Sequence, residues 1–267
     1  MKTQIANPAR HCPKCNSEEN QVNAGYNRSG TQRCICNYCK YKYTLNGKIQ
    51  EYPEEVKQQA IKTYFSGVSG RGVGKLMGFS KANVYNWLKK PSEMWISEAT
   101  ANEIFEMDEM YHFVERKANS ETRENIYVTT LVSREPRQIV GFSVAFDKSP
   151  ERLQGIVDNS PEAESYATDG YLAYIDLAYP GKHIRNVGDK GDTFTVEGIN
   201  ADLRHYIPVL ARRSRCFCRS LETLEAVLWV FIEAYNKFGE AKQRYRQRRQ
   251  ALGRSCKEVP FGVVDFL

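Results

Sequence analysis

Three acidic residues that lie far apart in this chain could together hold divalent metal ions. Asp108 lies within the strand-like run Phe105–Val114, Asp169 directly follows the short stretch Ser165–Thr168, and Glu197 begins a helical segment. Hard cations such as Mg²⁺ prefer oxygen ligands, and a pair of them can promote an in-line displacement at phosphorus. Because 61 and 28 residues separate the three acids, only a fold can bring their carboxylates together.

Two pairs of cysteines have the spacing of a structural zinc site. Cys12 and Cys15 form one Cys-x-x-Cys turn, Cys36 and Cys39 form a second, and 20 residues lie between the two turns. Each turn presents two thiolates to a tetrahedral ion, and a segment with so few large apolar residues needs the metal in order to fold. Cys34 is expected to be a bystander, because its spacing to Cys36 does not repeat the pattern.

Charge is distributed unevenly along the chain. Residues 1–95 carry 15 Lys and Arg against 6 Asp and Glu, residues 96–203 carry 10 against 20, and residues 204–267 carry 13 against 6. Basic ends suit nucleic acid, because neutralisation of phosphates supplies most non-specific affinity. The acidic middle would repel DNA unless divalent cations were bound there. This polarity indicates a metal-dependent core that basic flanks hold on DNA.

Neither a membrane span nor a secretory signal is expected from the sequence. The longest apolar run, Ala226–Ile232, has seven residues, whereas a span needs about 18. The N-terminal residues lack the apolar core of a signal peptide. We therefore expect a reducing compartment, in which the eight cysteines bind metal or remain free thiols.

Residues 54–90 predict three short helices in a helix-turn-helix arrangement. In the third helix, Val84, Trp87 and Leu88 fall at i, i+3 and i+4 and are expected to face inward, with Ser80 as the N-cap. The outer face, which would enter the major groove of DNA, consists of Lys81, Asn83, Asn86, Lys89 and Lys90. A small three-helix core with a solvated polar face is the alternative.

The central segment predicts a mixed α/β sheet. Three strand-like runs, Phe105–Val114, Asn125–Val132 and Gln138–Phe146, precede alternating helical and strand-like stretches. A last helix starts at Ser220 and is expected to end at Gly239. The segment that follows, residues 242–249, has five Lys and Arg in eight residues and is expected to contact phosphate; a solvated helical tail is the alternative.

An ordered set of short motifs runs through nearly the whole chain. They are Cys12-Pro-x-Cys15, Gln32-Arg33, Cys36-x-x-Cys39, Met107-Asp108-Glu109-Met110, Thr168-Asp169-Gly170-Tyr171, Glu197-x-x-Asn200, Leu203-Arg204, Ala211-Arg-Arg-Ser214, Phe217 and Arg219-Ser220. Together they resemble the insertion-sequence-1 family of bacterial transposases, which join an InsA-type zinc and helix-turn-helix region to an InsB-type catalytic domain. Gly198 departs from the pattern, because relatives often have Arg there. Cys216 and Cys218 replace small polar residues and are expected to be buried or neutral.

The resemblance implies an RNase H-like catalytic fold with an Asp-Asp-Glu triad. Carried over residue by residue, the triad is Asp108, Asp169 and Glu197, with two Mg²⁺ (or Mn²⁺) ions per active site beside a structural Zn²⁺. The expected division of the chain is a zinc-ribbon-like module (1–48), a helix-turn-helix DNA-binding domain (49–91), a linker (92–102), an RNase H-like catalytic domain with a mixed sheet (103–240) and a basic C-terminal tail (241–267).

The implied activity is that of a DNA transposase that binds the terminal inverted repeats of its own element and joins freed 3′-hydroxyl ends to target DNA. The implied partner is double-stranded DNA, and the implied assembly is a homo-oligomer, dimer or higher, on paired ends. The implied location is the cytoplasm of a prokaryote, in association with the nucleoid. A non-catalytic sequence-specific DNA-binding repressor and a metal-dependent nuclease without strand transfer are the alternatives.

Several further residues are candidates for the same chemistry. Strand alternation places Glu109 on an apolar face, where an unpaired carboxylate is costly, so Glu109 is expected at the end of the strand or as a supporting acid. Asn200 falls one helical turn after Glu197 and could orient water or phosphate. His205 could contact DNA, with a hydrogen-bonded structural histidine as the alternative. Phosphate contacts are expected from Arg204, Arg212, Arg213, Arg215 and Arg219.

Overall fold

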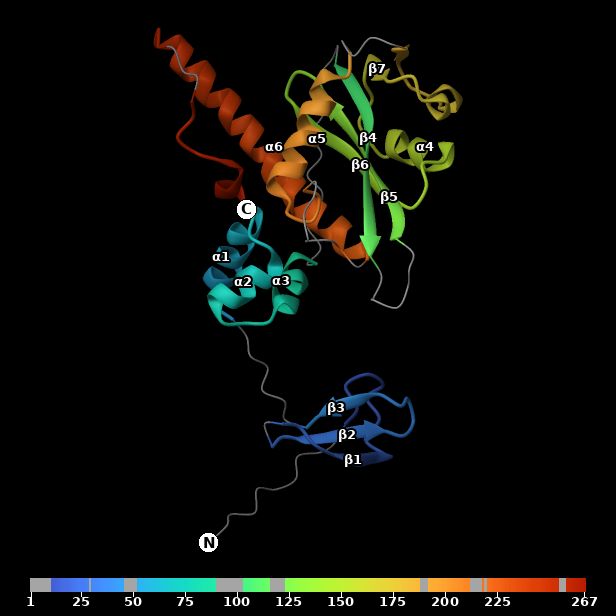
Figure 1. Ribbon diagram of the computed structural model, residues 1–267, viewed down its shortest axis with the longest axis vertical. Helices are drawn as coiled ribbons and strands as arrows, with labels where there is room; N and C mark the ends of the chain where they lie inside the picture. The colour runs from blue at the N-terminus through green and yellow to red at the C-terminus, as the bar shows by residue number, and fades with distance from the viewer. Residues whose placement is uncertain are drawn as a thin grey trace. The chain divides into compact units, whose positions relative to one another are not determined.

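The computed structural model describes residues 11–28, 30–45, 52–89, 103–115, 123–187, 192–211, 218, 220–254 and 258–267. The chain divides into two compact units, residues 1–52 and residues 53–267 (Figure 1). The expected linker at 92–102 lies outside the described residues, and so does the expected boundary between residues 48 and 49.

The first unit is a small antiparallel sheet of β1 (Gln21–Tyr26), β2 (Gln32–Cys36) and β3 (Lys42–Thr44), in the order β1-β2-β3. Both cysteine turns lie at the same end of this sheet, because Gln21 at the start of β1 pairs with Cys36 at the end of β2. A residue with left-handed backbone follows each turn, Asn16 with φ 54° and Lys40 with φ 59°. This conformation reverses the chain tightly after each pair of cysteines.

The second unit begins with α1 (Glu54–Phe65), α2 (Gly70–Met77) and α3 (Lys81–Leu88). Ser80 caps α3 as expected, because its side chain accepts a hydrogen bond from the backbone N–H of Ala82 at 3.2 Å. The turn between α2 and α3 requires Gly74, since a Cβ atom there would lie 2.5 Å from the carbonyl oxygen of Phe79. The described helices therefore match the predicted helix-turn-helix arrangement.

A mixed five-stranded sheet follows, in the order β6-β5-β4-β7-β8. Its strands are β4 (Ile104–Glu115), β5 (Arg123–Ser133), β6 (Gln138–Ala145), β7 (Ser165–Thr168) and β8 (Lys182–Arg185). The first three are antiparallel, whereas β7 and β8 continue the sheet in parallel with β4. This mixed α/β architecture was predicted, and it is compatible with an RNase H-like domain.

Helices cover both faces of this sheet (Figure 1). On one face, α4 (Pro150–Asp158) and the 3₁₀ helix η1 (Leu172–Asp176) enclose a core that includes Phe105 and Met107. On the other face, α5 (Phe194–Tyr206) and α6 (Leu221–Ala251) pack on a core that includes Met110. Alternate residues of β4 therefore face different helices.

The last helix is longer than the sequence pattern predicts. The expectation that Gly239 ends it is wrong, because α6 runs on to Ala251 and crosses the expected domain boundary at residue 240. Gly239 does not adopt the left-handed conformation of a C-cap. The C-terminal residues instead cover this part of α6, where Phe238 and Tyr245 meet Phe261 at 6.1 and 5.9 Å between ring centroids.

The three-helix segment shares its core with the five-stranded sheet. The rings of Phe65 in α1 and Phe231 in α6 lie 5.5 Å apart, and η2 (Val263–Phe266) packs between α1 and α6. Buried residues of both parts thus form one hydrophobic cluster. None of the described helices is both long enough and apolar enough to cross a bilayer.

Candidate active site

The end of β7 brings three carboxylates together. The parallel pairing of β4 with β7 ends at Met107 and Thr168, so Asp108 and Glu109 on β4 and Asp169 after β7 emerge at the same edge. One oxygen atom from each of these acids lies within 4.8 Å of the other two. The close approach of Asp108 and Asp169, which the sequence could only suggest, thus follows from the parallel register of two strands.

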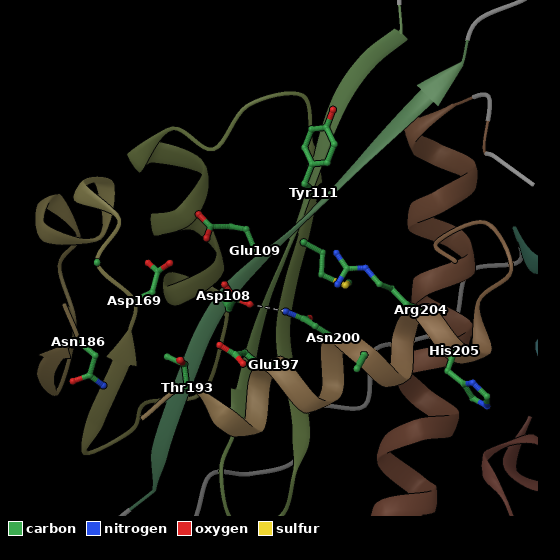
Figure 2. Close-up of a pocket in the computed structure, with 13 residues that line it drawn as sticks. Asp108, Glu109, Tyr111, Asp169, Asn186, Thr193, Glu197, Asn200, Arg204 and His205 are labelled. Carbon is green, nitrogen blue, oxygen red and sulfur yellow. Dashed lines mark hydrogen bonds between the residues drawn. The ribbon is translucent and has the colours of Figure 1, made fainter. Parts of the chain in front are cut away.

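Glu197 approaches the same pocket from α5. Four acids, Asp108, Glu109, Asp169 and Glu197, line one cavity of about 930 Å³. Figure 2 shows how their side chains lie around it. Glu197 lies outside the group of three acids within 4.8 Å, but its negative charge contributes to raising the pKa of Asp108. The structure therefore brings all three predicted triad residues to one pocket, with Glu109 closer to the two aspartates than Glu197 is.

Asp108 is held by a hydrogen bond from α5. Asn200 Nδ2 donates to Asp108 Oδ2 at 3.0 Å (Figure 2). Thr130 Oγ1 donates to Asn200 Oδ1 at 2.9 Å. Burial raises the pKa of Asp108, as do the charges of Asp169 and Glu197, while Asn200 opposes the shift. Because the pocket disfavours the ionised form of Asp108 in this way, a cation bound there would stabilise the carboxylate strongly.

Glu109 lies on the apolar face that strand alternation predicts, and Lys148 compensates its charge. The two side chains form an ion pair with 3.6 Å between Nζ and Oε1. Burial raises the pKa of Glu109, whereas the charge of Lys148 lowers it. Among the described residues, Glu109 Oε1 has no hydrogen-bond partner although it is buried. An unsatisfied carboxylate oxygen beside two aspartates fits an oxygen-liganded divalent cation such as Mg²⁺.

The turn after β7 fixes the direction of Asp169. Asp169 Oδ1 accepts a hydrogen bond from the backbone N–H of Tyr171 at 2.8 Å, and the guanidinium of Arg185 donates to the carbonyl of Gly170. The ammonium group of Lys148 lies 3.5 Å from the centre of the Tyr171 ring. Lys148 thereby links Glu109 to the turn that carries Asp169.

Two residues that position α5, Glu106 and Arg134, were not predicted from the sequence. Glu106 is fully buried, accepts a hydrogen bond from the backbone N–H of Val196 and pairs with Arg134 at 2.6 Å. In the sequence, Glu106 is one of many acids in the central segment. Its spacing of two residues from Asp108, which puts both on one face of a strand, was the available signal.

The other candidate residues lie in different places. Arg204 and His205 line the pocket on α5, and Figure 2 shows His205 pointing away from the carboxylates. On α3, Lys81 and Asn86 are exposed and Asn83 is partly exposed, and Lys89 at the C-cap of this helix is exposed as well. The candidates Lys90, Arg212, Arg213, Arg215 and Arg219 lie outside the described residues, as does Cys216. Cys218 is buried, which raises the pKa of its thiol to about 12.

The four cysteines of the two turns form a cluster with the dimensions of a zinc site. The Sγ atoms of Cys12 and Cys39 lie 3.5 Å apart, and those of Cys15 and Cys36 lie 3.7 Å apart. Zn–S bonds of about 2.3 Å in a tetrahedron place sulfur atoms roughly 3.8 Å apart, so the cluster fits Zn²⁺.

Backbone and side-chain donors favour the thiolate form of Cys36 in this cluster. The backbone N–H of Cys39 lowers the pKa of Cys36 to about 6 against the effect of burial, and Gln21 Nε2 adds a hydrogen bond of 3.3 Å to the same sulfur. Zinc binds the thiolate form of cysteine, so these donors favour a metal ligand at this position. Cys34 is buried but does not belong to the cluster of four.

Comparison with known proteins adds one distant structural likeness. No protein-family model matches the sequence, and no curated protein matches it. Among solved structures, the chain is similar to a paired-end complex of the Mos1 transposase with the left transposon end, with a TM-score of 0.31 and 11% sequence identity over 77% of this chain and 80% of that chain. A likeness at this TM-score carries no argument about function, which therefore rests on the site itself.

Proposed function

We propose that this chain is a DNA transposase that cuts the ends of its own element and joins the freed 3′-hydroxyls to target DNA. The observation that carries the proposal is the convergence of Asp108, Asp169 and Glu197, from three separate elements, on one open pocket. The ordered motifs that resemble the insertion-sequence-1 family support the same assignment.

In this proposal, some pocket residues would bind metal ions and others would position those ligands or the DNA. Asp108, Asp169 and Glu197 would hold two Mg²⁺ or Mn²⁺ ions, which when bound activate the attacking oxygen and stabilise the leaving oxygen. Asn200 keeps one oxygen of Asp108 oriented toward α5. Arg204 lines the pocket beyond Asn200, where its positive charge suits a DNA phosphate.

The remaining parts of the chain would bind DNA. The exposed side chains of Lys81 and Asn86 on α3, and of Lys89 at its C-cap, suit recognition of the terminal inverted repeats in the major groove. The four-cysteine cluster would bind a structural Zn²⁺ and stabilise the first unit. A homo-oligomer on paired DNA ends would bring two such active sites together.

The test is a strand-transfer assay with the full chain. A labelled duplex that carries an end of the encoding element is incubated with plasmid target DNA and Mg²⁺, and cleaved and joined products are separated by electrophoresis. Asp169→Asn is expected to bind the duplex normally but to lose both products. The matched control is Asp176→Asn, which changes an exposed acid that does not line the pocket and is expected to keep both products.

The outcomes separate the proposal from its two alternatives. Binding without any cleavage by the unmodified chain would indicate a repressor. Cleavage without joined product would indicate a nuclease that lacks strand transfer. Either result would contradict the proposed transposase, whereas Mg²⁺-dependent joining that requires Asp169 supports it.

A further inference from the structure

A buried carboxylate outside the active-site pocket anchors the first turn of α5. Glu106 is fully buried and does not line the cavity. Its Oε2 atom accepts a hydrogen bond from the backbone N–H of Val196 at 2.8 Å. The residue before the helix, Thr193, makes no side-chain cap of its own. Glu106 therefore caps α5 from a neighbouring strand, and its negative charge suits the N-terminus of a helix.

Arg134, directly after β5, completes this anchor. Its Nε atom donates to Glu106 Oε1 at 2.6 Å, and its Nη2 atom donates to the carbonyl oxygen of Asp192 at 2.8 Å. The guanidinium also lies 5.5 Å from the centre of the Phe194 ring. Arg134 thus neutralises the buried carboxylate and holds the residues that lead into α5.

Two contacts of matching spacing fix α5 along β4. Glu106 and Asp108 lie on the same face of the strand, about 6.6 Å apart along it. Their partners on α5, Val196 and Asn200, are one turn apart, which is about 6 Å along the helix axis. Glu197 follows Val196 directly, so it lies between the two anchored positions. The height of Glu197 relative to Asp108 is therefore set by this pair of contacts.

We propose that Glu106, held by Arg134, is a positioning residue that sets the separation of Glu197 from Asp108 and so tunes the affinity of the pocket for divalent cations. The inference rests on the proposed function, in which these carboxylates hold metal ions. A purely stabilising ion pair is a poor explanation for the arrangement, because buried pairs contribute little net stability compared with apolar packing. The distinction is measurable, since stability and metal affinity can be determined separately.

The experiment compares Glu106→Gln with Tyr235→Phe in the full, zinc-loaded chain. Tyr235→Phe is the matched control because it removes another anchor of α5, the hydrogen bond of 2.7 Å from the Tyr235 hydroxyl to Asp202. Mn²⁺ binding is measured by calorimetry without DNA. The part of the binding heat that is lost in Asp169→Asn is assigned to the pocket. Thermal melting is followed for each variant, and cleavage of the labelled duplex is measured as Mg²⁺ is raised.

The expected result is a change in metal affinity that stability does not explain. Glu106→Gln keeps an acceptor for Val196 but loses the charge that holds Arg134, so Mn²⁺ affinity should fall by about 10- to 100-fold. Its cleavage rate should recover as the Mg²⁺ concentration is raised. The Mn²⁺ affinity of Tyr235→Phe should stay within about twofold of that of the unmodified chain, even if its melting temperature falls as far as that of Glu106→Gln. The reason is that the hydrogen bond between Tyr235 and Asp202 lies beyond the turn of α5 that faces the metal site.

Failure of the inference is distinguishable from failure of the proposed function. If Glu106→Gln melts earlier but binds Mn²⁺ like the unmodified chain, Glu106 has only a structural role and the inference is overturned. If the unmodified chain binds Mn²⁺ in the pocket but never cleaves DNA, the proposed function fails, while the binding data still decide the role of Glu106.

If Glu106→Gln does not fold, Arg134→Lys provides the test. Its shorter reach to the Asp192 carbonyl should weaken Mn²⁺ binding in the same direction, and unchanged affinity would overturn the inference.

Discussion

Asn200 on α5 donates a hydrogen bond across 3.0 Å to Asp108 on β4, and this contact joins the helix to the edge of the sheet that carries the clustered carboxylates. The amide oxygen of Asn200 accepts from Thr130, which is the cross-strand partner of Asp108. Asn200 is only 2% exposed, so both of its polar groups are used inside the protein rather than on DNA. Asn200 was expected to orient water or phosphate, but its hydrogen bonds in the structure instead orient the Asp108 carboxylate.

Substitution of Asn200 by Ala should weaken metal-dependent cleavage more than it weakens the fold. Asp108 would lose its oriented partner and Thr130 would lose its acceptor, so the apparent Mg²⁺ affinity should fall by about 10- to 100-fold. The control is Asn236→Ala. Asn236 is also buried and bonds both backbone groups of Ile139, but it does not line the pocket of the carboxylates. A similar Mg²⁺ requirement in both variants would show that Asn200 matters only for stability.

Replacement of Asp108 by Asn should stabilise the protein when no divalent cation is present. Burial and two neighbouring acids raise the pKa of Asp108 above its unfolded value. The stability that this carboxyl contributes is therefore complete below its unfolded pKa and is lost as pH rises through the higher folded pKa. At pH 7 the ionised group is unfavourable, and its removal should raise Tm by roughly 2–4 °C, the change that corresponds to about 1 kcal/mol.

The same variant should lose its response to Mg²⁺. Melting curves with and without the ion at pH 5 and pH 8 test both parts of this prediction. The advantage of Asp108→Asn over the unmodified chain should be larger at pH 8, and addition of Mg²⁺ should stabilise only the unmodified chain. A variant that melts earlier than the unmodified chain at pH 8 without metal would contradict the account of the pocket.

The sequence predicted the architecture well because its signals were local. Alternation in β4, the cap at Ser80 and the cysteine turns each lie within a few residues of the feature that they specify. The anchor at Glu106 was not predicted, because its partners Arg134 and Val196 lie 28 and 90 residues away in the sequence. Only the packing of α5 on the sheet brings them to Glu106. The predicted end of α6 was wrong for a related reason. Gly239 is a common helix terminator, but tertiary contacts with the C-terminal aromatic residues override that local preference.

Glu197 and Glu109 compete for the third metal-ligand position, and matched substitutions should separate their roles. Glu109 lies closer to the two aspartates, yet Lys148 already neutralises it. We therefore expect Glu197→Gln to lower the cleavage rate by at least about 100-fold and Glu109→Gln to lower it by only about tenfold. Single-turnover cleavage at saturating Mg²⁺ measures both. The reverse order of effects would make Glu109 the third ligand and would remove Glu197 from the proposed triad.

Removal of zinc should unfold the first unit without affecting the second. Loss of one thiolate in Cys36→Ser should abolish stoichiometric zinc binding, because folding of such small modules depends on about 10–16 kcal/mol of metal-binding free energy. Cys34→Ala is the control, since Cys34 is buried and lies two residues before Cys36 but does not belong to the cluster. Metal analysis and limited proteolysis should show a zinc-free, protease-sensitive first unit in Cys36→Ser and a protected second unit in both variants. Retention of zinc by Cys36→Ser would contradict the four-cysteine assignment.

The basic end of α6 should contribute to DNA affinity through phosphate contacts. Arg244 and Arg248 are exposed one helical turn apart, and among the described residues their one ion pair is the loose 3.8 Å contact of Arg244 with Glu240. If both contact phosphates, Arg244→Gln with Arg248→Gln should reduce the slope of log affinity against log salt by about 2. Lys237→Gln is the control on the same helix, because Lys237 already pairs with Glu233 and should change the slope little. Equal slopes for the double variant and the unmodified chain would instead identify this part of α6 as a solvated helix, held in place by the aromatic residues of the C-terminal segment.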